Sequence, residues 1–172
     1  MYAMAAVSLA ALRKRDPDRP RSYRLPYAGV LCPIAFICAN FIVYWSGWNT
    51  VFWLYVLIAL GFVLFGVYQA MIPAERRAIL NWRSGSWILP WLVGLAIISW
   101  QGQYSSASPV LGITLNDTNN IPFWWDLVVV AVFSLVIYYF AVSLALTTEE
   151  VATAVKTVEE EARAEQSALA IG

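Results

Sequence analysis

The chain has 172 residues, of which 60% are hydrophobic and 13% are charged, and its mean hydropathy is +0.63. A soluble domain averages about 45–50% apolar and about 25% charged residues, so this composition predicts an integral membrane protein. Lys and Arg together number 11, as do Asp and Glu, and the chain has no His. Balanced charge gives no reason to expect a nucleic-acid partner, and the lack of His removes the commonest general base and metal ligand. We therefore expect no enzyme activity, no catalytic residue, no cofactor and no metal site.

The chain opens with an apolar stretch, residues 1–12, followed directly by Arg13, Lys14 and Arg15. A secretory signal carries its positive charge before the apolar stretch, whereas here the charge follows it. Twelve helical residues span about 18 Å, which is less than a bilayer needs. Residues 1–12 are therefore either a short segment on the membrane surface or, as we favour, the end of a truncated transmembrane helix. A basic loop follows at residues 13–26.

Four apolar stretches within residues 27–146 predict four transmembrane helices, at about 27–45, 51–72, 87–103 and 122–146. The second is the clearest, whereas the third is short and contains Pro90 and Gly94. Asp126 lies close to the start of the fourth stretch, where its carboxylate can reach the membrane interface. Because the stretches are apolar all round, we expect helices immersed in lipid.

Polar residues are few within these stretches. Asn40 and Gln69 carry amides, and we expect Asn40 to form a hydrogen bond between helices. None of the stretches has an ionisable residue at mid-depth, which is the usual mark of an ion path. Cys32 and Cys38 show no metal or redox spacing. Two pairs of small residues at i and i+4 permit close helix contact but are common by chance: Gly66 with Ala70, and Ala141 with Ala145.

The positive charges fix an expected orientation. All 11 Lys and Arg residues lie in residues 13–26, 73–86 and 147–172, and none lies in the other loops. The positive-inside rule therefore places those three segments in the cytoplasm. Thr147 and Glu150 have the spacing of a capping box, so residues 147–172 are expected to form an acidic, amphipathic cytoplasmic tail helix.

The segment from Leu12 to Pro33 reads LRKRDPDRPRSYRLPYAGVLCP. It resembles the cytoplasmic loop between the tenth and eleventh helices of amino-acid permeases of the amino acid–polyamine–organocation superfamily. Ser22 stands where that family usually has Pro. The later stretches resemble the fourteen-helix members, including aspartate–proton symporter-like permeases. The matching positions are Leu12-Arg13, Pro17-Asp18, Arg21, Tyr23-Arg24 and Pro26.

This resemblance implies an all-α membrane protein with part of an inverted-repeat transporter fold. The helices that form the family's substrate site would lie upstream of Met1, so no substrate-binding residue is assigned in this chain. We expect the C-terminal part of a secondary active transporter that moves amino acids across the cell membrane and is not competent alone. Its expected partners are the lipid bilayer and, in the full-length protein, the amino acid, while partner helices stay unidentified. The alternative is a small independent membrane protein that acts as an accessory or structural subunit; a membrane enzyme is disfavoured.

Overall fold

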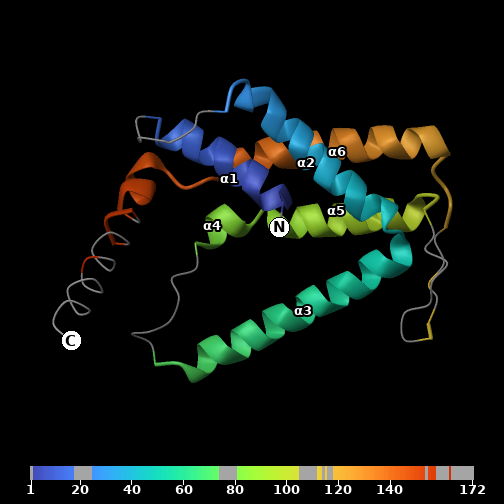
Figure 1. The fold of residues 1–172 in the computed structure, drawn as a ribbon. Coiled ribbons are helices and arrows are strands. Elements are labelled where there is room, and N and C mark those ends of the chain that lie inside the picture. The colour runs from blue at the N-terminus through green and yellow to red at the C-terminus, as the bar shows by residue number, and fades with distance from the viewer. Residues whose placement is uncertain are drawn as a thin grey trace.

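The computed structural model describes residues 2–17, 25–73, 81–104, 112–113, 115, 118–153, 155–157 and 163. The regular elements in these residues are helices (Figure 1). They are α1 (Tyr2–Arg15), α2 (Ala28–Trp45), α3 (Trp48–Met71), α4 (Trp82–Gly85), α5 (Ile88–Gln101) and α6 (Phe123–Ser143).

Helices α1, α2, α5 and α6 pack together, and we call these four helices the core bundle. Helix α2 packs against both α1 and α6, α1 also contacts α6, and α5 packs along α6. Phe36 of α2 is fully buried, and its ring lies 5.8 Å from the ring of Tyr138 and 6.1 Å from that of Trp91. Aromatic pairs at these distances add to the area they bury, so this cluster is a principal contact of the core bundle.

Helix α3 diverges from the core bundle (Figure 1). In the 18-residue apolar stretch of α3 only 6% of the residues are buried within the protein, compared with 33% in that of α2. Gly47, with φ at 79°, makes the turn between α2 and α3, a conformation that favours glycine. The N–H of Trp48 then donates to the carbonyl of Tyr104 at 3.1 Å, which fixes the start of α3 near the end of α5. The rest of α3 exposes apolar side chains such as Leu57, which is 64% exposed, so its surroundings must be apolar.

In the part of the chain that the structure describes, three helices are long and apolar enough to cross a membrane: Ala28–Trp45, Trp48–Met71 and Trp124–Ser143. Three of the four predicted stretches therefore contain a membrane-length helix. Helix α5 has 14 residues and is about 21 Å long, so it is shorter than a bilayer core. Pro90 does not interrupt α5, because it lies in the first turn, where a missing N–H breaks no helical hydrogen bond. Gly94 lies against the ring of Phe133 in α6, so here it permits close packing.

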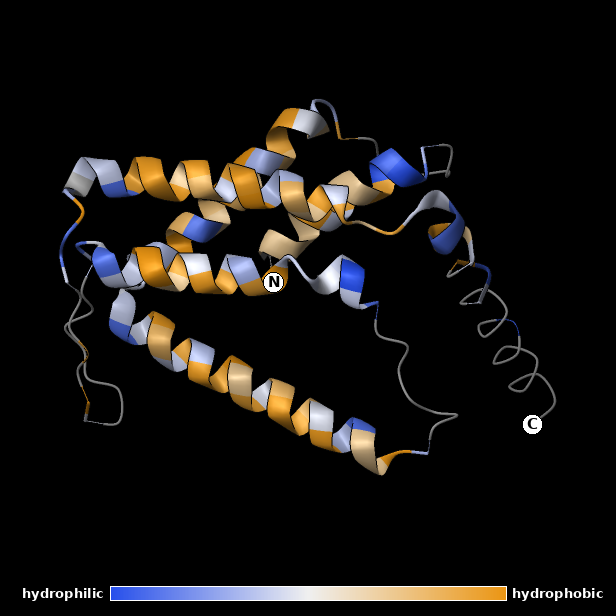
Figure 2. Ribbon diagram, turned by 180° about the vertical axis from the view of Figure 1, so that it is seen from behind, coloured by the Kyte–Doolittle hydropathy of each residue, from blue (hydrophilic) through white to orange (hydrophobic). Residues whose placement is uncertain are grey.

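The described basic residues gather at one end of the protein. This end holds Arg13, Lys14 and Arg15 at the end of α1 and Arg83 in α4. The start of α2, the end of α3 and the tail lie at the same end (Figure 1). The blue, hydrophilic residues of α1 and α4 mark the same end in Figure 2. We call it the basic end. The end of α2, the start of α3, the end of α5 and the start of α6 lie at the opposite end.

The capping box of the tail is present in the structure. The N–H of Thr147 donates to Oε2 of Glu150 at 2.7 Å, and the N–H of Glu150 donates back to Oγ1 of Thr147 at 3.4 Å. Residues 148–153 and 155–157 are helical. Most of the expected tail helix beyond them, and residues 18–24 of the permease-like segment, lie outside the described residues.

Candidate functional site

Asn40 joins three helices through its side-chain amide. Its Nδ2 donates to Oγ of Ser134 in α6 at 2.8 Å, and its Oδ1 accepts a hydrogen bond from Nε1 of Trp91 in α5 at 3.0 Å. Oγ of Ser134 in turn donates to the carbonyl of Val130 at 2.6 Å. Asn40 and Ser134 are fully buried. The expectation that Asn40 forms a hydrogen bond between helices is therefore confirmed, and the amide uses both of its polar atoms within the core bundle.

A second buried contact joins α2 and α6 near the end opposite the basic end. The hydroxyl of Tyr44 donates to Oδ2 of Asp126 at 2.6 Å, and both side chains are fully buried. Oδ1 of Asp126 accepts from the N–H of Leu127 at 2.7 Å, and the first turn of a helix favours negative charge. Asp126 lies near the start of its helix, as expected. Its carboxylate is bound to Tyr44 inside the bundle, and its reach to the membrane interface stays a prediction.

Glycine makes room for this pair. A Cβ at Gly102, just after α5, would overlap the hydroxyl of Tyr44 and would lie 2.7 Å from a carbon of its ring. The ring of Tyr104 packs edge-on against Tyr44 at 5.3 Å between centroids. The segment after α5 therefore closes over the Tyr44–Asp126 contact and keeps it from water.

The connection before α6 satisfies the last carbonyls of α5. The N–H of Thr118 donates to the carbonyl of Trp100 at 2.9 Å, and the N–H groups of Asn120 and Ile121 donate to that of Gln101 at 3.0 and 3.1 Å. These carbonyls have no partner within the helix, so the connection caps α5. This cap holds the α5–α6 connection against the end of the core bundle.

The other residues that the sequence singled out do not gather at one place. Gly66 lies in α3 with open space around it, so the Gly66–Ala70 pair contacts no helix in the described chain. Ala141 is 2% exposed and belongs to the cluster that packs α1, α2 and α6, whereas Ala145 is half-buried. Cys32 is buried, Cys38 is exposed, and both are free thiols. Among the described residues, no group of His, Cys, Asp or Glu is placed to hold a metal ion.

These polar groups of the core bundle therefore form hydrogen bonds with one another. Asn40, Trp91, Ser134, Tyr44 and Asp126 are joined in pairs across three helices, with distances of 2.6–3.0 Å. Sequence reasoning missed Tyr44 and Ser134, which look ordinary in an apolar helix. A signal was present for the pair, since a lone carboxylate in an otherwise apolar helix calls for a donor in a neighbouring helix. What this arrangement does chemically is to hold α2, α5 and α6 in register.

The chain is similar in sequence to curated amino-acid transporters. It is 35% identical over 144 residues to an aspartate-proton symporter of Bacillus subtilis, covering 81% of this chain and 25% of that protein. It is 27% identical over 148 residues to the glutamate/serine transporter AimA of the same organism, covering 86% of this chain and 26% of that protein. The chain is homologous to amino-acid transporters of the amino acid–polyamine–organocation type.

The resemblance to amino-acid permeases of this superfamily is thereby confirmed. A third relative, the branched-chain amino acid permease BcaP of Bacillus subtilis, is 28% identical over 68 residues, or 40% of this chain and 15% of that protein. The chain spans about a quarter of the length of the first two relatives. No family model and no solved structure matches it. The relatives are named as transporters and the apolar helices have membrane length, and these two findings support a multi-pass membrane protein.

Proposed function

We propose that this chain is the C-terminal part of a secondary active transporter that moves amino acids across the cell membrane, and that it does not transport alone. The observation that carries the proposal is the homology to two amino-acid transporters of which the chain matches about a quarter. A transporter of the inverted-repeat type forms its site at the midplane between broken helices. Those helices would belong to the rest of the protein.

The geometry of the core bundle supports a scaffold role within that transporter. Helices α2, α3 and α6 run unbroken for 18, 24 and 21 residues. The buried amide of Asn40 and the carboxylate of Asp126 are both held by hydrogen bonds to other helices. Polar groups that bind a substrate must be free to exchange partners, whereas these groups join helices. We assign to them the support of the moving part of the transporter.

We further propose that the basic end faces the cytoplasm, so that the tail after Thr147 is cytoplasmic. The support is the one-sided distribution of all 11 Lys and Arg residues in the sequence and the gathering of the described ones at one end. In this orientation α1 ends in the cytoplasm, and the short turn at Gly47 lies outside the cell.

Transport assays on two proteins test the proposal. The full reading frame that contains this chain and the 172-residue chain alone are each reconstituted in liposomes, and a proton gradient is imposed. Uptake of radiolabelled aspartate, glutamate, serine and branched-chain amino acids is then measured, because the relatives' names give this range. We expect saturable uptake of one or more of them by the full protein and none by the chain alone.

Saturable uptake by the chain alone would overturn the assignment of the site to other helices. A reading frame that proves to encode this chain and nothing more, with no uptake, would replace the proposal with the accessory-subunit alternative.

A further inference from the structure

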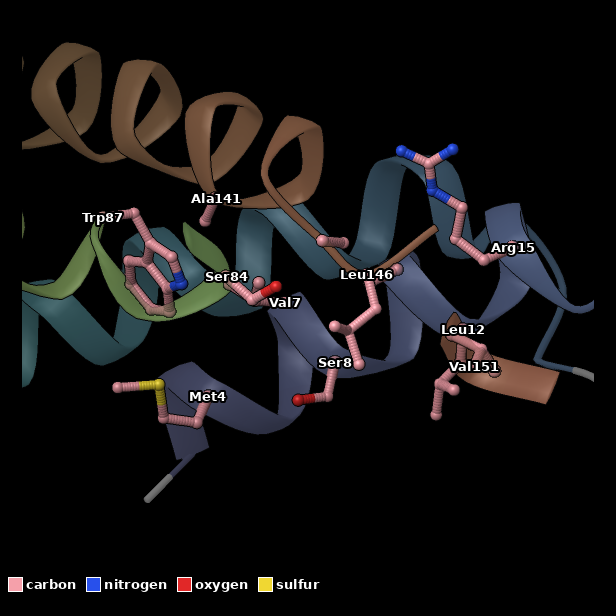
Figure 3. A pocket seen from close by; sticks show the side chains of 12 residues that line it. Met4, Val7, Ser8, Leu12, Arg15, Ser84, Trp87, Ala141, Leu146 and Val151 are labelled. Carbon is pink, nitrogen blue, oxygen red and sulfur yellow. The ribbon is translucent and has the colours of Figure 1, made fainter. Parts of the chain in front are cut away.

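An elongated cavity of about 320 Å³ lies at the basic end, between α1, α6 and the start of α5 (Figure 3). Ligand-binding cavities in proteins have volumes of about 300–1,000 Å³, so this one is large enough to hold a ligand group. One wall is a single face of α1, because its residues repeat at three- and four-residue steps. This face is about 16 Å long from its first to its last residue. Its residues are Met4, Val7, Ser8, Ala11, Leu12 and Arg15.

The opposite wall is apolar and made in part by small side chains. Ala141 and Ala145 leave the space that larger residues would fill, and Trp87 at the start of α5 closes one end. Leu146 and Val151 line the cavity from the connection and the first turns of the tail. An apolar and elongated cavity of this kind suits a hydrocarbon chain and does not suit a hydrophilic amino acid.

Arg15 gives the cavity a positive group at one end. It lies in the last turn of α1, and its Nε atom is buried with no hydrogen-bond partner among the described residues. Arg13, two residues earlier, also has a buried Nε without a partner among the described residues, but its Nη1 donates to the carbonyl of Leu25 at 2.8 Å. The nearby carboxylate of Glu150 is bound by the N–H and hydroxyl of Thr147 at 2.7 and 3.0 Å.

The end of the cavity at Arg15 has the residue pattern of a membrane interface. Apolar residues of α1 end at Leu12 and three basic residues follow, while α6 ends at Ser143 and the exposed capping box begins at Thr147. Basic pockets between helices at this depth bind anionic lipid head groups.

We propose that this cavity binds one acyl chain of an anionic phospholipid, whose phosphate is held by the guanidinium of Arg15. The α1 face and the two alanines receive the hydrocarbon, and the guanidinium of Arg15 donates to a phosphate oxygen. A free phosphate would leave the apolar walls without an occupant, which is why the bilayer is the source. This site is independent of transport, since it needs only the described helices.

Native mass spectrometry of the purified chain tests the site. The detergent-solubilised chain is titrated with phosphatidylglycerol or with phosphatidylcholine of the same acyl chains, and the fraction that retains one lipid is measured. We expect preferential retention of phosphatidylglycerol. Arg15→Gln should weaken this retention about fivefold, because one basic residue near the lipid head groups contributes about 1 kcal/mol, which corresponds to a factor of about five in affinity. Lys14→Gln is the matched control, because it removes the same charge from an exposed position that does not line the cavity.

A second pair of variants tests the acyl chain. Ala145→Phe fills the cavity from a half-buried position and should reduce retention of both lipids, whereas Ala70→Phe adds the same ring to the exposed side of α3 and should not. Circular dichroism establishes that each variant is helical before it is scored. Equal retention of the two lipids by the parent chain, equal effects of Arg15→Gln and Lys14→Gln, or no effect of Ala145→Phe would each overturn the proposal.

Discussion

Replacing Tyr44 by Phe removes one oxygen atom from the core bundle and leaves the ring in place. That oxygen donates to Oδ2 of Asp126 at 2.6 Å, and neither side chain has any exposed surface. In Tyr44→Phe the carboxylate keeps its hydrogen bond from the N–H of Leu127 but loses its side-chain donor. Because water has no access to this position, nothing replaces the hydroxyl.

The magnitude follows from the type of bond. A hydrogen bond to a charged group contributes about 1.5–3 kcal/mol net, while bonds between helices in membranes average about 0.6 and reach about 1.7 kcal/mol. Full burial and the 2.6 Å distance place the Tyr44–Asp126 contact at the strong end, so we expect Tyr44→Phe to lower the free energy of unfolding by about 1.5–2 kcal/mol. Tyr139→Phe is the control, because Tyr139 is 60% exposed on α6; its effect should stay within about 0.5 kcal/mol.

Reversible unfolding in mixed detergent micelles, followed by circular dichroism, measures these values. A double-mutant cycle with Asp126→Ala isolates the contact, and the coupling energy should be at least about 1 kcal/mol. If the coupling falls below about 0.3 kcal/mol, or if Tyr44→Phe is no more harmful than Tyr139→Phe, then the pair does not stabilise the α2–α6 contact and our reasoning fails.

Three further predictions concern packing, orientation and pH. Gly94→Ala should destabilise the chain by about 1–3 kcal/mol in the same unfolding assay, because its methyl group would overlap an aromatic ring of α6. Gly66→Ala is the control, because its methyl group meets open space and should not destabilise the chain. Equal effects of the two substitutions would contradict the packing of α5 against α6. With both native cysteines replaced by Ser, a Cys introduced at exposed Thr153 should react with a membrane-impermeant maleimide only after cell lysis, and reaction in intact cells would reverse the orientation. The N–H and hydroxyl of Thr147 hold the pKa of Glu150 below its ordinary value, so the capping box stabilises the tail at neutral pH and loses this effect as the pH falls through that lowered pKa. In a carboxyl NMR titration Thr147→Ala should raise the pKa of Glu150, and an unchanged value would show that the capping box does not set it.

The sequence predicts the helices well because hydropathy is a local property. The cores of α2, α3 and α6 follow from stretches that are apolar on every side. The bond between helices made by Asn40 was also predictable, since a buried amide must find partners. Those partners, Trp91 and Ser134, were not predictable, because they lie 51 and 94 residues away along the chain.

Two other features lay beyond reach of the sequence for physical reasons. The lone carboxylate of Asp126 indicates that a neighbouring helix supplies a donor, but the donor, Tyr44, is 82 residues distant, so no local pattern identifies it. The separation of α3 from the core bundle is equally hidden, because a helix that is apolar all round has no polar face to reveal which side packs. The shortness of α5 was visible in its sequence, but its true length depends on the cap that the connection to α6 supplies.

Helix α3 is attached to the core bundle at one end, so a change of angle at that end moves its far end the most. Its start is fixed by Gly47 and by the bond from Trp48 to Tyr104, while Met71 stands at its far end with 79% of its surface exposed. Twenty-four helical residues form an arm of about 36 Å, so a rotation of about 10° at Gly47 displaces Met71 by about 6 Å. A small change of angle outside the core bundle is therefore converted into a displacement of more than one helical turn at the basic end.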